Sequence, residues 1–424
     1  MTLSAAPDTR AAREALAADA RCRSCGSGGL RLFLSLGDLP LPDALLREDQ
    51  LDGPEPRFPL DVAFCPACSL VQILEDVPPE QLFVENYLYF SSFSEGLLRH
   101  SREHAERLVE ERALGPESFV CEIASNDGYM LRNFVDRGIP VLGIDPAPTQ
   151  AAAAEAAGVP TLTEFFGPHV ARRVRDEQGP ADVIIANNVM AHTPDLNGLV
   201  AGMAILLADD GIVTIENTYV KDLIDHCEFD TIYHEHFCYF SCTAVDRLAR
   251  RHGLELVRVD HFPDLQGGTL RWRLARHGPA HESVARYLRA EEEDGLTDAS
   301  YYERFAERVE GVRRDLRALL GDLVAGGSSI AAYGAAAKGS TLVNYAGIGP
   351  QHVSFVVDRN EHKQGLFMPG THIPVRHPDA LLEEQPDYVL LLAWNYRDEV
   401  MRQQAEYRER GGRFIVPVPT PEVV

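Results

Sequence analysis

Residues 233–236 read Tyr-His-Glu-His and bring a phenol, a carboxylate and two imidazoles together in four consecutive positions. Burying so many polar groups costs free energy unless they face solvent or a site. Histidine titrates near neutral pH and is the usual general base, and a tyrosine hydroxyl can donate to a developing oxyanion. The segment therefore indicates proton-transfer chemistry. A surface loop and a metal site formed by His234 and His236 are the alternatives, whereas the zinc-protease pattern H-E-x-x-H is absent.

Four of the eight cysteines form two C-x-x-C pairs, Cys22 with Cys25 and Cys65 with Cys68. Each pair places two thiolates on a tight turn, and two such turns complete a tetrahedral four-sulfur zinc site. A closed four-cysteine site leaves no position open to substrate, so we expect this zinc to be structural. The alternatives are four free thiols or two disulfides, which a reducing cytoplasm disfavours.

The stretch from Glu122 to Gly128 lies where an apolar run meets the start of a helix. Cofactors of parallel sheets bind at such carboxyl ends of strands. The G-x-G-x-x-G pattern of dinucleotide enzymes is absent, and Glu122 would repel a pyrophosphate but attract a sulfonium or an ammonium group. Asp145 ends the next apolar run and is placed to accept hydrogen bonds from ribose hydroxyls. These features favour S-adenosylmethionine over NAD, with ordinary acids at strand-to-helix turns as the alternative.

Other residues could belong to the same pocket. Phe165 could cover an adenine ring or lie in the core. Asn187 and Asn188 end a third apolar run, where polar side chains face the cofactor crevice, although one of them could instead cap a helix. Lys338 follows small residues at a predicted helix start, so helix amides and its charge could converge on a phosphate.

Apolar runs that alternate with helical segments must position these residues, and this alternation predicts an α/β fold with doubly wound parallel sheets. The runs of the first sheet are 119–123, 141–145, 181–186 and 211–216. The runs of a second, smaller Rossmann-like sheet are 329–334, 353–358, 388–392 and 414–417. We expect three domains: a zinc-binding module at 15–84, a cofactor-binding domain at 85–280 and a C-terminal domain at 281–424.

The charge balance restricts the partners of this 424-residue chain. Its 40 Lys and Arg against 64 Asp and Glu give a net charge of −24, which opposes nucleic-acid binding and so a zinc-ribbon enzyme that modifies RNA. No apolar run approaches the ~20 residues of a membrane span. Residues 1–20 lack the basic-then-apolar order of a secretory signal. We therefore expect a cytoplasmic protein with no membrane partner.

Four features occur in one order along the chain: the zinc pairs, the turn at 122–128 (the cofactor turn), the Y-H-E-H segment and the second sheet. This order resembles the sugar C-methyltransferases of bacterial deoxysugar biosynthesis. The resemblance extends from Cys22 to about Pro417, and Ala124 departs from it where the family has glycine. Members methylate nucleotide-linked 4-keto sugars, usually at C3. The resemblance implies a nucleotide-sugar-binding C-terminal domain, a substrate linked to thymidine diphosphate, and a monomer or weak homo-oligomer.

The resemblance also implies residue roles. His236 would remove the C3 proton, Tyr233 and Glu235 would hold the sugar and the base, and His192 would be a further substrate contact. S-Adenosylmethionine would bind around Glu122, Asn126, Gly128, Asp145 and Asn187 or Asn188, and Phe165 stays a further candidate for the cofactor site from the residues alone. Further substrate contacts would come from Tyr87 and Tyr89 in an aromatic lid, and from Lys338, Asn344, Lys363 and His372.

Two other functions remain open from the sequence. A methyltransferase of the same architecture could act on another small molecule or on oxygen, which needs no enolate. A two-sheet nicotinamide oxidoreductase would instead bind NAD.

Overall fold

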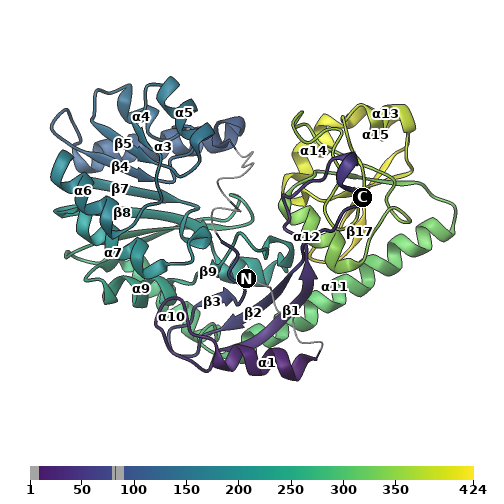
Figure 1. Ribbon diagram of the computed structural model, residues 1–424, viewed down its shortest axis with the longest axis horizontal. Helices are drawn as coiled ribbons and strands as arrows, with labels where there is room; N and C mark the ends of the chain where they lie inside the picture. The colour runs from purple at the N-terminus through teal and green to yellow at the C-terminus, as the bar shows by residue number, and fades with distance from the viewer. Residues whose placement is uncertain (1–8, 79–81, 83–89) are drawn as a thin grey trace.

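The computed structural model describes residues 9–78, residue 82 and residues 90–424. Two lobes stand side by side, and the N-terminal segment lies between them at their base (Figure 1). Each of these three bodies is built around its own sheet. Tyr87 and Tyr89, the residues expected in an aromatic lid, lie outside the described residues.

The N-terminal module combines helix α1 (Arg10–Asp19) with an antiparallel sheet in the order β1-β2-β3-β9. Its strands are β1 (Arg31–Leu39), β2 (Phe58–Phe64), β3 (Val71–Ile73) and β9 (Cys238–Tyr239). Strand β9 comes from far along the chain, and Tyr239 pairs with Val71. Because β9 begins two residues after His236, this module anchors one end of the Y-H-E-H segment.

The first lobe is built on a seven-stranded sheet in the order β10-β11-β8-β7-β4-β5-β6. Five strands are parallel: β4 (Val120–Ile123), β5 (Val141–Ile144), β6 (Thr161–Leu162), β7 (Ala181–Asn187) and β8 (Leu207–Thr218). An antiparallel hairpin of β10 (Glu255–Phe262) and β11 (Thr269–Ala275) extends the sheet beyond β8. The helices are α3 (Glu95–Arg112), α4 (Arg132–Val135), α5 (Pro148–Ala156), α6 (Pro168–Gln178), α7 (Leu196–Leu206), α8 (Val220–Asp225) and α9 (Cys242–Arg251).

The second lobe holds a six-stranded sheet in the order β14-β13-β12-β15-β16-β17, parallel except for its last strand. The strands are β12 (Ile330–Tyr333), β13 (Val356–Val357), β14 (Val375–Arg376), β15 (Tyr388–Leu391), β16 (Arg413–Val416) and β17 (Glu422–Val423). Its helices are α12 (Ala337–Ala346), α13 (Ala380–Glu384), α14 (Arg397–Gln403) and α15 (Ala405–Glu409). Helices α10 (Glu282–Glu293) and α11 (Ala299–Ala325) connect the lobes, and α11 runs along the base of the second one (Figure 1).

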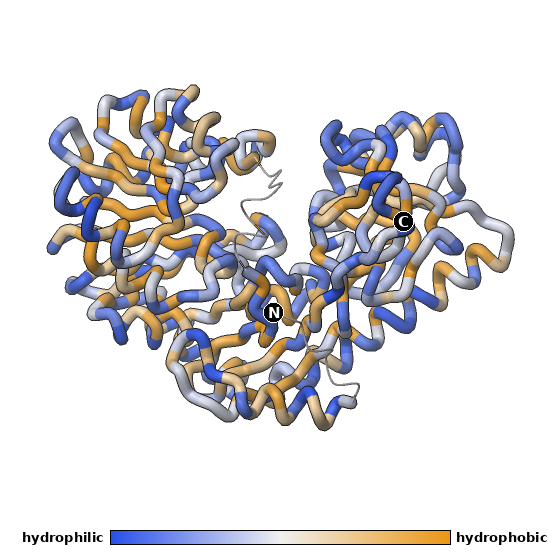
Figure 2. Tube along the Cα trace, in the orientation of Figure 1, coloured by the Kyte–Doolittle hydropathy of each residue, from blue (hydrophilic) through white to orange (hydrophobic). Residues whose placement is uncertain are grey.

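Hydrophobic residues follow the strands through the centre of each lobe, and polar residues lie mostly outside (Figure 2). Four consecutive residues of β7, from Val183 to Ala186, are fully buried, as expected for a parallel strand that is covered on both faces. This arrangement confirms the predicted α/β class with an N-terminal zinc module, a doubly wound central domain and a smaller C-terminal Rossmann-like domain.

Candidate active site

A cavity of about 470 Å³ lies between the lobes, and all three bodies contribute to its wall. The central sheet contributes the carboxyl ends of β5, β7 and β8, as expected for a ligand site of a doubly wound sheet. The C-terminal domain contributes the start of α12, and the N-terminal module contributes Asp43. The predicted site residues that line the cavity are Asn126, Asp145, Phe165, Asn187, Asn188, His192, Tyr233, Glu235, His236, Lys338 and Lys363.

The turn after β4 has an unusual backbone. Ala124, Asn126 and Gly128 all have positive φ angles, of 52°, 49° and 77°. A Cβ atom on Gly128 would come within 2.9 Å of a Val159 methyl group, so the close packing of this turn requires glycine. The Asp145 carboxylate accepts a hydrogen bond from the Asn126 backbone N–H at 2.8 Å. Asp145 therefore shapes the turn and also faces the cavity.

Glu122, on β4 just before this turn, is 1% exposed and is not among the cavity-lining residues. Neither of its carboxylate oxygens has a hydrogen-bond partner among the described residues. Burial raises its pKa well above the usual range, and the nearby Asp145 and Asp127 add to the shift. A buried carboxylate without a protein partner is costly unless a ligand supplies a cation or hydrogen-bond donors. S-Adenosylmethionine carries both a sulfonium and an ammonium group, so this acid fits that cofactor.

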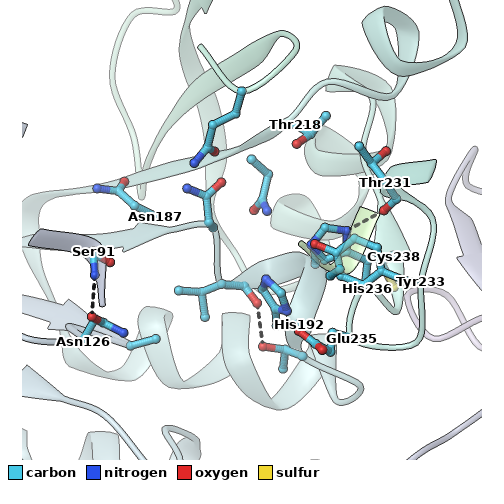
Figure 3. Close-up of a pocket in the computed structure, with 18 of the residues that line it drawn as sticks. Ser91, Asn126, Asn187, His192, Thr218, Thr231, Tyr233, Glu235, His236 and Cys238 are labelled. Atoms are coloured by element: carbon cyan, nitrogen blue, oxygen red, sulfur yellow. Dashed lines mark hydrogen bonds between the residues drawn. The ribbon is translucent and has the colours of Figure 1, made fainter. Parts of the chain in front are cut away.

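His236 lines the cavity beside Tyr233 and His192. Its Nδ1 donates a hydrogen bond to the Thr231 carbonyl at 2.8 Å, which leaves Nε2 as the acceptor nitrogen (Figure 3). Its ring lies 4.1 Å from the Tyr233 ring and 4.7 Å from the His192 ring, measured between centroids. Burial, assisted by His192, lowers the pKa of His236 well below its usual value. The imidazole is therefore neutral near pH 7 and able to accept a proton.

Burial also shifts the pKa values of His192 and Glu235, the two neighbouring candidates. Burial lowers the pKa of His192 to about 4. Glu235 is 7% exposed, and burial together with Asp43 raises its pKa well above the usual range, while Lys363 opposes that shift. The Lys363 ammonium donates to the Ala335 carbonyl at 2.7 Å and lies 3.4 Å from Asp43. Glu235 thus lies where the N-terminal module meets the C-terminal domain.

The four predicted metal ligands converge. The Sγ atoms of Cys22 and Cys68 are 3.5 Å apart, those of Cys25 and Cys65 are 3.6 Å apart, and all four lie within 4.8 Å of one another. A tetrahedral ion with bonds of about 2.3 Å to sulfur would separate its ligands by about 3.8 Å, so the cluster fits zinc. It is closed by its own cysteines and away from the cavity, which fits a structural role.

Three family models match successive parts of this chain. They are described as a zinc binding domain, at residues 22–83, a methyltransferase domain, at 97–259, and a C-methyltransferase C-terminal domain, at 264–419. C-methyltransferase NovU from Streptomyces niveus is 37% identical over 406 residues, which cover 95% of this chain and 96% of NovU. The chain belongs to the C-methyltransferase family. This confirms the predicted family, the S-adenosylmethionine-dependent C-methyltransferase activity and the zinc module, and it argues against a nicotinamide oxidoreductase.

Two solved structures also resemble part of this methyltransferase. Magnesium protoporphyrin IX methyltransferase from Synechocystis PCC 6803, with bound SAH, is 12% identical with a TM-score of 0.36 and covers 47% of this chain and 92% of its own. An S-adenosylmethionine-dependent methyltransferase from Clostridium acetobutylicum is 9% identical with a TM-score of 0.34, with coverages of 43% and 92%. In the described part of the methyltransferase, no helix is both long and apolar enough to cross a membrane.

The C-terminal candidates of the methyltransferase do not all meet at the cavity. The Lys338 ammonium lies 4.3 Å above the Trp394 ring, and Lys338 lines the cavity together with Lys363. The Asn344 amide instead donates to the Ser340 carbonyl at 2.9 Å, on its own helix. His372 lies 3.4 Å from the Glu55 carboxylate. Neither Asn344 nor His372 is among the cavity-lining residues.

His234 and His236 of the methyltransferase have different partners, although only one residue separates them. His234 is 1% exposed, and its Nε2 donates to the Phe58 and Pro59 carbonyls at 3.2 Å each. It therefore fastens the Y-H-E-H segment to β2 of the zinc module. Among the described residues, the four cysteines are the only group of three or more candidate ligands that could hold a metal. A metal site at His234 and His236 thus finds no support.

Sequence reasoning missed several polar residues of the cavity wall. Asn217 and Thr218 end β8, and Asn395 follows β15. The side-chain oxygens of Asn217 and Asn395 are buried without a hydrogen-bond partner in the described structure, so both can bind a ligand. Asn217 follows the fourth apolar run as Asn187 follows the third, and that position was the available signal.

Proposed function

We propose that this methyltransferase methylates C3 of a nucleotide-linked 4-keto-deoxysugar, with thymidine diphosphate as the nucleotide. The observation that carries the proposal is the neutral His236, whose Nε2 can accept a proton in the same cavity that receives the cofactor turn. A carbon next to a ketone is acidic because its anion spreads charge onto oxygen. The 4-keto group makes C3 such a carbon.

Each residue around His236 has a part in this proposal. His236 Nε2 takes the C3 proton, and the electron pair passes to the ketone oxygen to form an enolate. Tyr233, whose ring packs on His236, donates to that oxygen, and Glu235 holds the sugar. S-Adenosylmethionine supplies an electrophilic methyl group when it is bound at residues 122–128. Holding the sugar in line with that group accounts for much of the rate, since proximity can lower a barrier by ~7–11 kcal/mol.

The C-terminal side of the cavity supports an anionic substrate. Lys338 and Lys363 line it, although the whole chain has a net charge of −24. The start of α12, at Ala337 and Lys338, also faces the cavity and offers backbone N–H groups. These groups together suit a diphosphate. We therefore assign the nucleotide part of the substrate to the C-terminal domain and the sugar to the region around Tyr233 and Glu235.

A proton NMR spectrum of one reaction tests the proposal. The mixture contains the purified enzyme, S-adenosylmethionine and a thymidine-diphosphate-linked 4-keto-2,6-dideoxyhexose. The proposal predicts that the C3 proton signal disappears and that an uncoupled C-methyl singlet grows. An O-methyl signal would contradict both the reaction and the role of His236, and an unchanged substrate would contradict the substrate assignment.

A further inference from the structure

We propose that Asp230 is a positioning residue through which the C-terminal domain holds His236 in the tautomer that can accept a proton. This inference rests on the proposed function, in which His236 is the base. Asp230 does not line the cavity, so it would act on the reaction through the backbone of the next residue.

The first step is the link from Asp230 to His236. Asp230 is the middle residue of a single 3-10 turn, η4 (Phe229–Thr231), which precedes the Y-H-E-H segment. The last residue of that turn, Thr231, provides the carbonyl that accepts the Nδ1–H of His236 at 2.8 Å. Imidazole nitrogens in a neutral ring share one proton, so this acceptor decides that Nδ1 carries it and Nε2 does not.

The second step is the attachment of η4 to the other lobe. Asp230 is fully buried, and its Oδ2 accepts a hydrogen bond from the Trp394 indole N–H at 2.7 Å. Trp394 belongs to η5 (Trp394–Tyr396), a short turn that follows β15 in the C-terminal domain after Leu392 and Ala393. Phe229 of the same turn packs against the Tyr345 ring of α12, with centroids 5.4 Å apart. Two successive side chains of η4 are therefore held by the C-terminal domain.

The third step is electrostatic. The second oxygen of Asp230 has no hydrogen-bond partner in the described structure, and a buried carboxylate is stable only if it is compensated. Burial raises the pKa of Asp230, and the Lys338 charge opposes that shift; the Lys338 ammonium also lies over the Trp394 ring at 4.3 Å. Asp230, Trp394 and Lys338 thus form one unit that joins the nucleotide side of the cavity to the turn behind the base.

The test compares Trp394→Phe and Asp230→Asn with the wild-type enzyme. Phenylalanine keeps an aromatic ring beneath Lys338 and removes the N–H donor, whereas asparagine keeps an acceptor for the indole and removes the charge. The loss of a hydrogen-bonded partner behind a metal-ligating histidine typically costs about 10–100-fold in activity, and we take the same scale for a partner behind the base. We expect Trp394→Phe to lower kcat by about that factor with an unchanged KM for S-adenosylmethionine. We expect Asp230→Asn to retain more activity than Trp394→Phe.

Two readouts separate positioning from a general loss of stability. Nitrogen-15 NMR of labelled histidines, with His236→Gln to assign the signal, should show one His236 tautomer in the wild type and a mixture in Trp394→Phe. In Trp394→Phe, the acid limb of the kcat–pH profile should move to lower pH, because the His236 imidazolium loses the Thr231 carbonyl as its hydrogen-bond acceptor. The titratable groups that face His236 are Tyr233, His192, Tyr239 and Lys338, and neither substitution replaces them.

The matched control is Tyr345→Phe. It removes a hydroxyl that donates to Glu310 at 3.2 Å and leaves the ring against Phe229, so we expect wild-type turnover and a single tautomer. An unchanged His236 tautomer in Trp394→Phe would overturn the inference, whether or not the melting temperature falls. Full activity of His236→Gln would instead overturn the proposed function itself, and the inference with it.

Discussion

Glu122 and Glu216 are buried glutamates of the same sheet, on β4 and β8, but their surroundings are opposite. Burial alone would raise the pKa of Glu216, yet Arg271 and His100 outweigh burial and lower it to about 2. His100 Nε2, on α3, lies 3.0 Å from the Glu216 carboxylate, and the Arg271 guanidinium also pairs with it. Glu122 has no such partner among the described residues, and burial raises its pKa.

The two histidines of the Y-H-E-H segment also differ in how far protein groups bind their side chains. His234 is fixed by two backbone carbonyls of the zinc module, whereas His236 keeps an acceptor nitrogen beside the cavity. Glu216 and His234, which accept or donate hydrogen bonds within the protein, are expected to stabilise the fold, whereas Glu122 and His236 are expected to act on ligands. The comparison therefore assigns each group either to stability or to binding and catalysis, and the following changes test that division.

Removal of zinc is expected to have the largest effect. Structural zinc sites contribute roughly 10–16 kcal/mol of apparent binding free energy to folding. Because β9 pairs with β3, unfolding of the zinc module would also release the end of the Y-H-E-H segment. Dialysis against a strong chelator should therefore abolish activity together with the cooperative melting transition. Retained turnover after metal analysis shows zinc to be absent would contradict this role.

The next largest effect is expected for Glu216→Gln. Removing one partner of a buried ion pair typically costs 3–5 kcal/mol, because Arg271 would keep an uncompensated charge. Denaturant unfolding should show a loss of about that size. The affinity of the folded enzyme for S-adenosylmethionine should stay near that of the wild type. A loss below about 1 kcal/mol would show that the pairing of Glu216 with Arg271 and His100 stabilises the fold no more than an exposed ion pair does.

Glu122→Gln should lower the affinity for S-adenosylmethionine and leave the stability of the fold nearly unchanged, the reverse of Glu216→Gln. A charge-assisted hydrogen bond contributes about 1.5–3 kcal/mol, so the dissociation constant for S-adenosylmethionine should rise about 10–100-fold. The free energy of unfolding should change much less than for Glu216→Gln, since Glu122 has no hydrogen-bond partner to lose in the part of the chain that the structure describes. Calorimetric titration measures the affinity, with the exposed Glu117→Gln as the control. Equal affinities of wild type and Glu122→Gln would remove Glu122 from the cofactor site.

The smallest expected effect is a pH dependence of stability. The folded pKa of Glu216, about 2, lies below its ordinary value of 4.5, so its contribution is complete above pH 4.5 and is lost as pH falls towards 2. Between pH 5 and pH 3 the loss should be on the order of 2 kcal/mol. Denaturant unfolding of wild type and Glu216→Gln at both pH values measures the part of this loss that comes from the Glu216 carboxylate. The difference between the two proteins should shrink at pH 3, and a constant difference would contradict the pairing.

Much of the fold was predictable because the apolar runs at 119–123, 141–145, 181–186 and 211–216 are long enough to mark parallel strands, and they became β4, β5, β7 and β8. Helix α3 begins at Glu95, after a Ser94 side chain that accepts from the Leu97 N–H, and serine in that position is a common start signal of a helix. Strand β9 was not predictable, since its two residues carry no periodicity and pair with a strand more than 160 residues earlier.

The site was predictable where a residue's position at the end of a parallel strand determines that its side chain faces the ligand crevice. Residues at the carboxyl ends of β5 and β7 had to meet, and Asp145 and Asn187 do line one cavity. The sequence cannot tell which histidine of the Y-H-E-H segment turns inward, because the carbonyls of Phe58 and Pro59 decide that. Asn344 satisfies its amide on Ser340, one helical turn earlier, rather than on a ligand. Ala124 shows that the cofactor turn tolerates a methyl group at a positive φ angle.

Exchange of the C3 proton in deuterated water tests the central claim most directly. The thymidine-diphosphate-linked 4-keto sugar is incubated with enzyme and S-adenosylhomocysteine, so that no methyl group can be transferred and only proton removal is seen by NMR. We predict exchange with the wild type, nearly normal exchange with folded His234→Gln, and a rate reduced about 10²–10⁴-fold with His236→Gln. Exchange at the wild-type rate in His236→Gln would show that His236 is not the base.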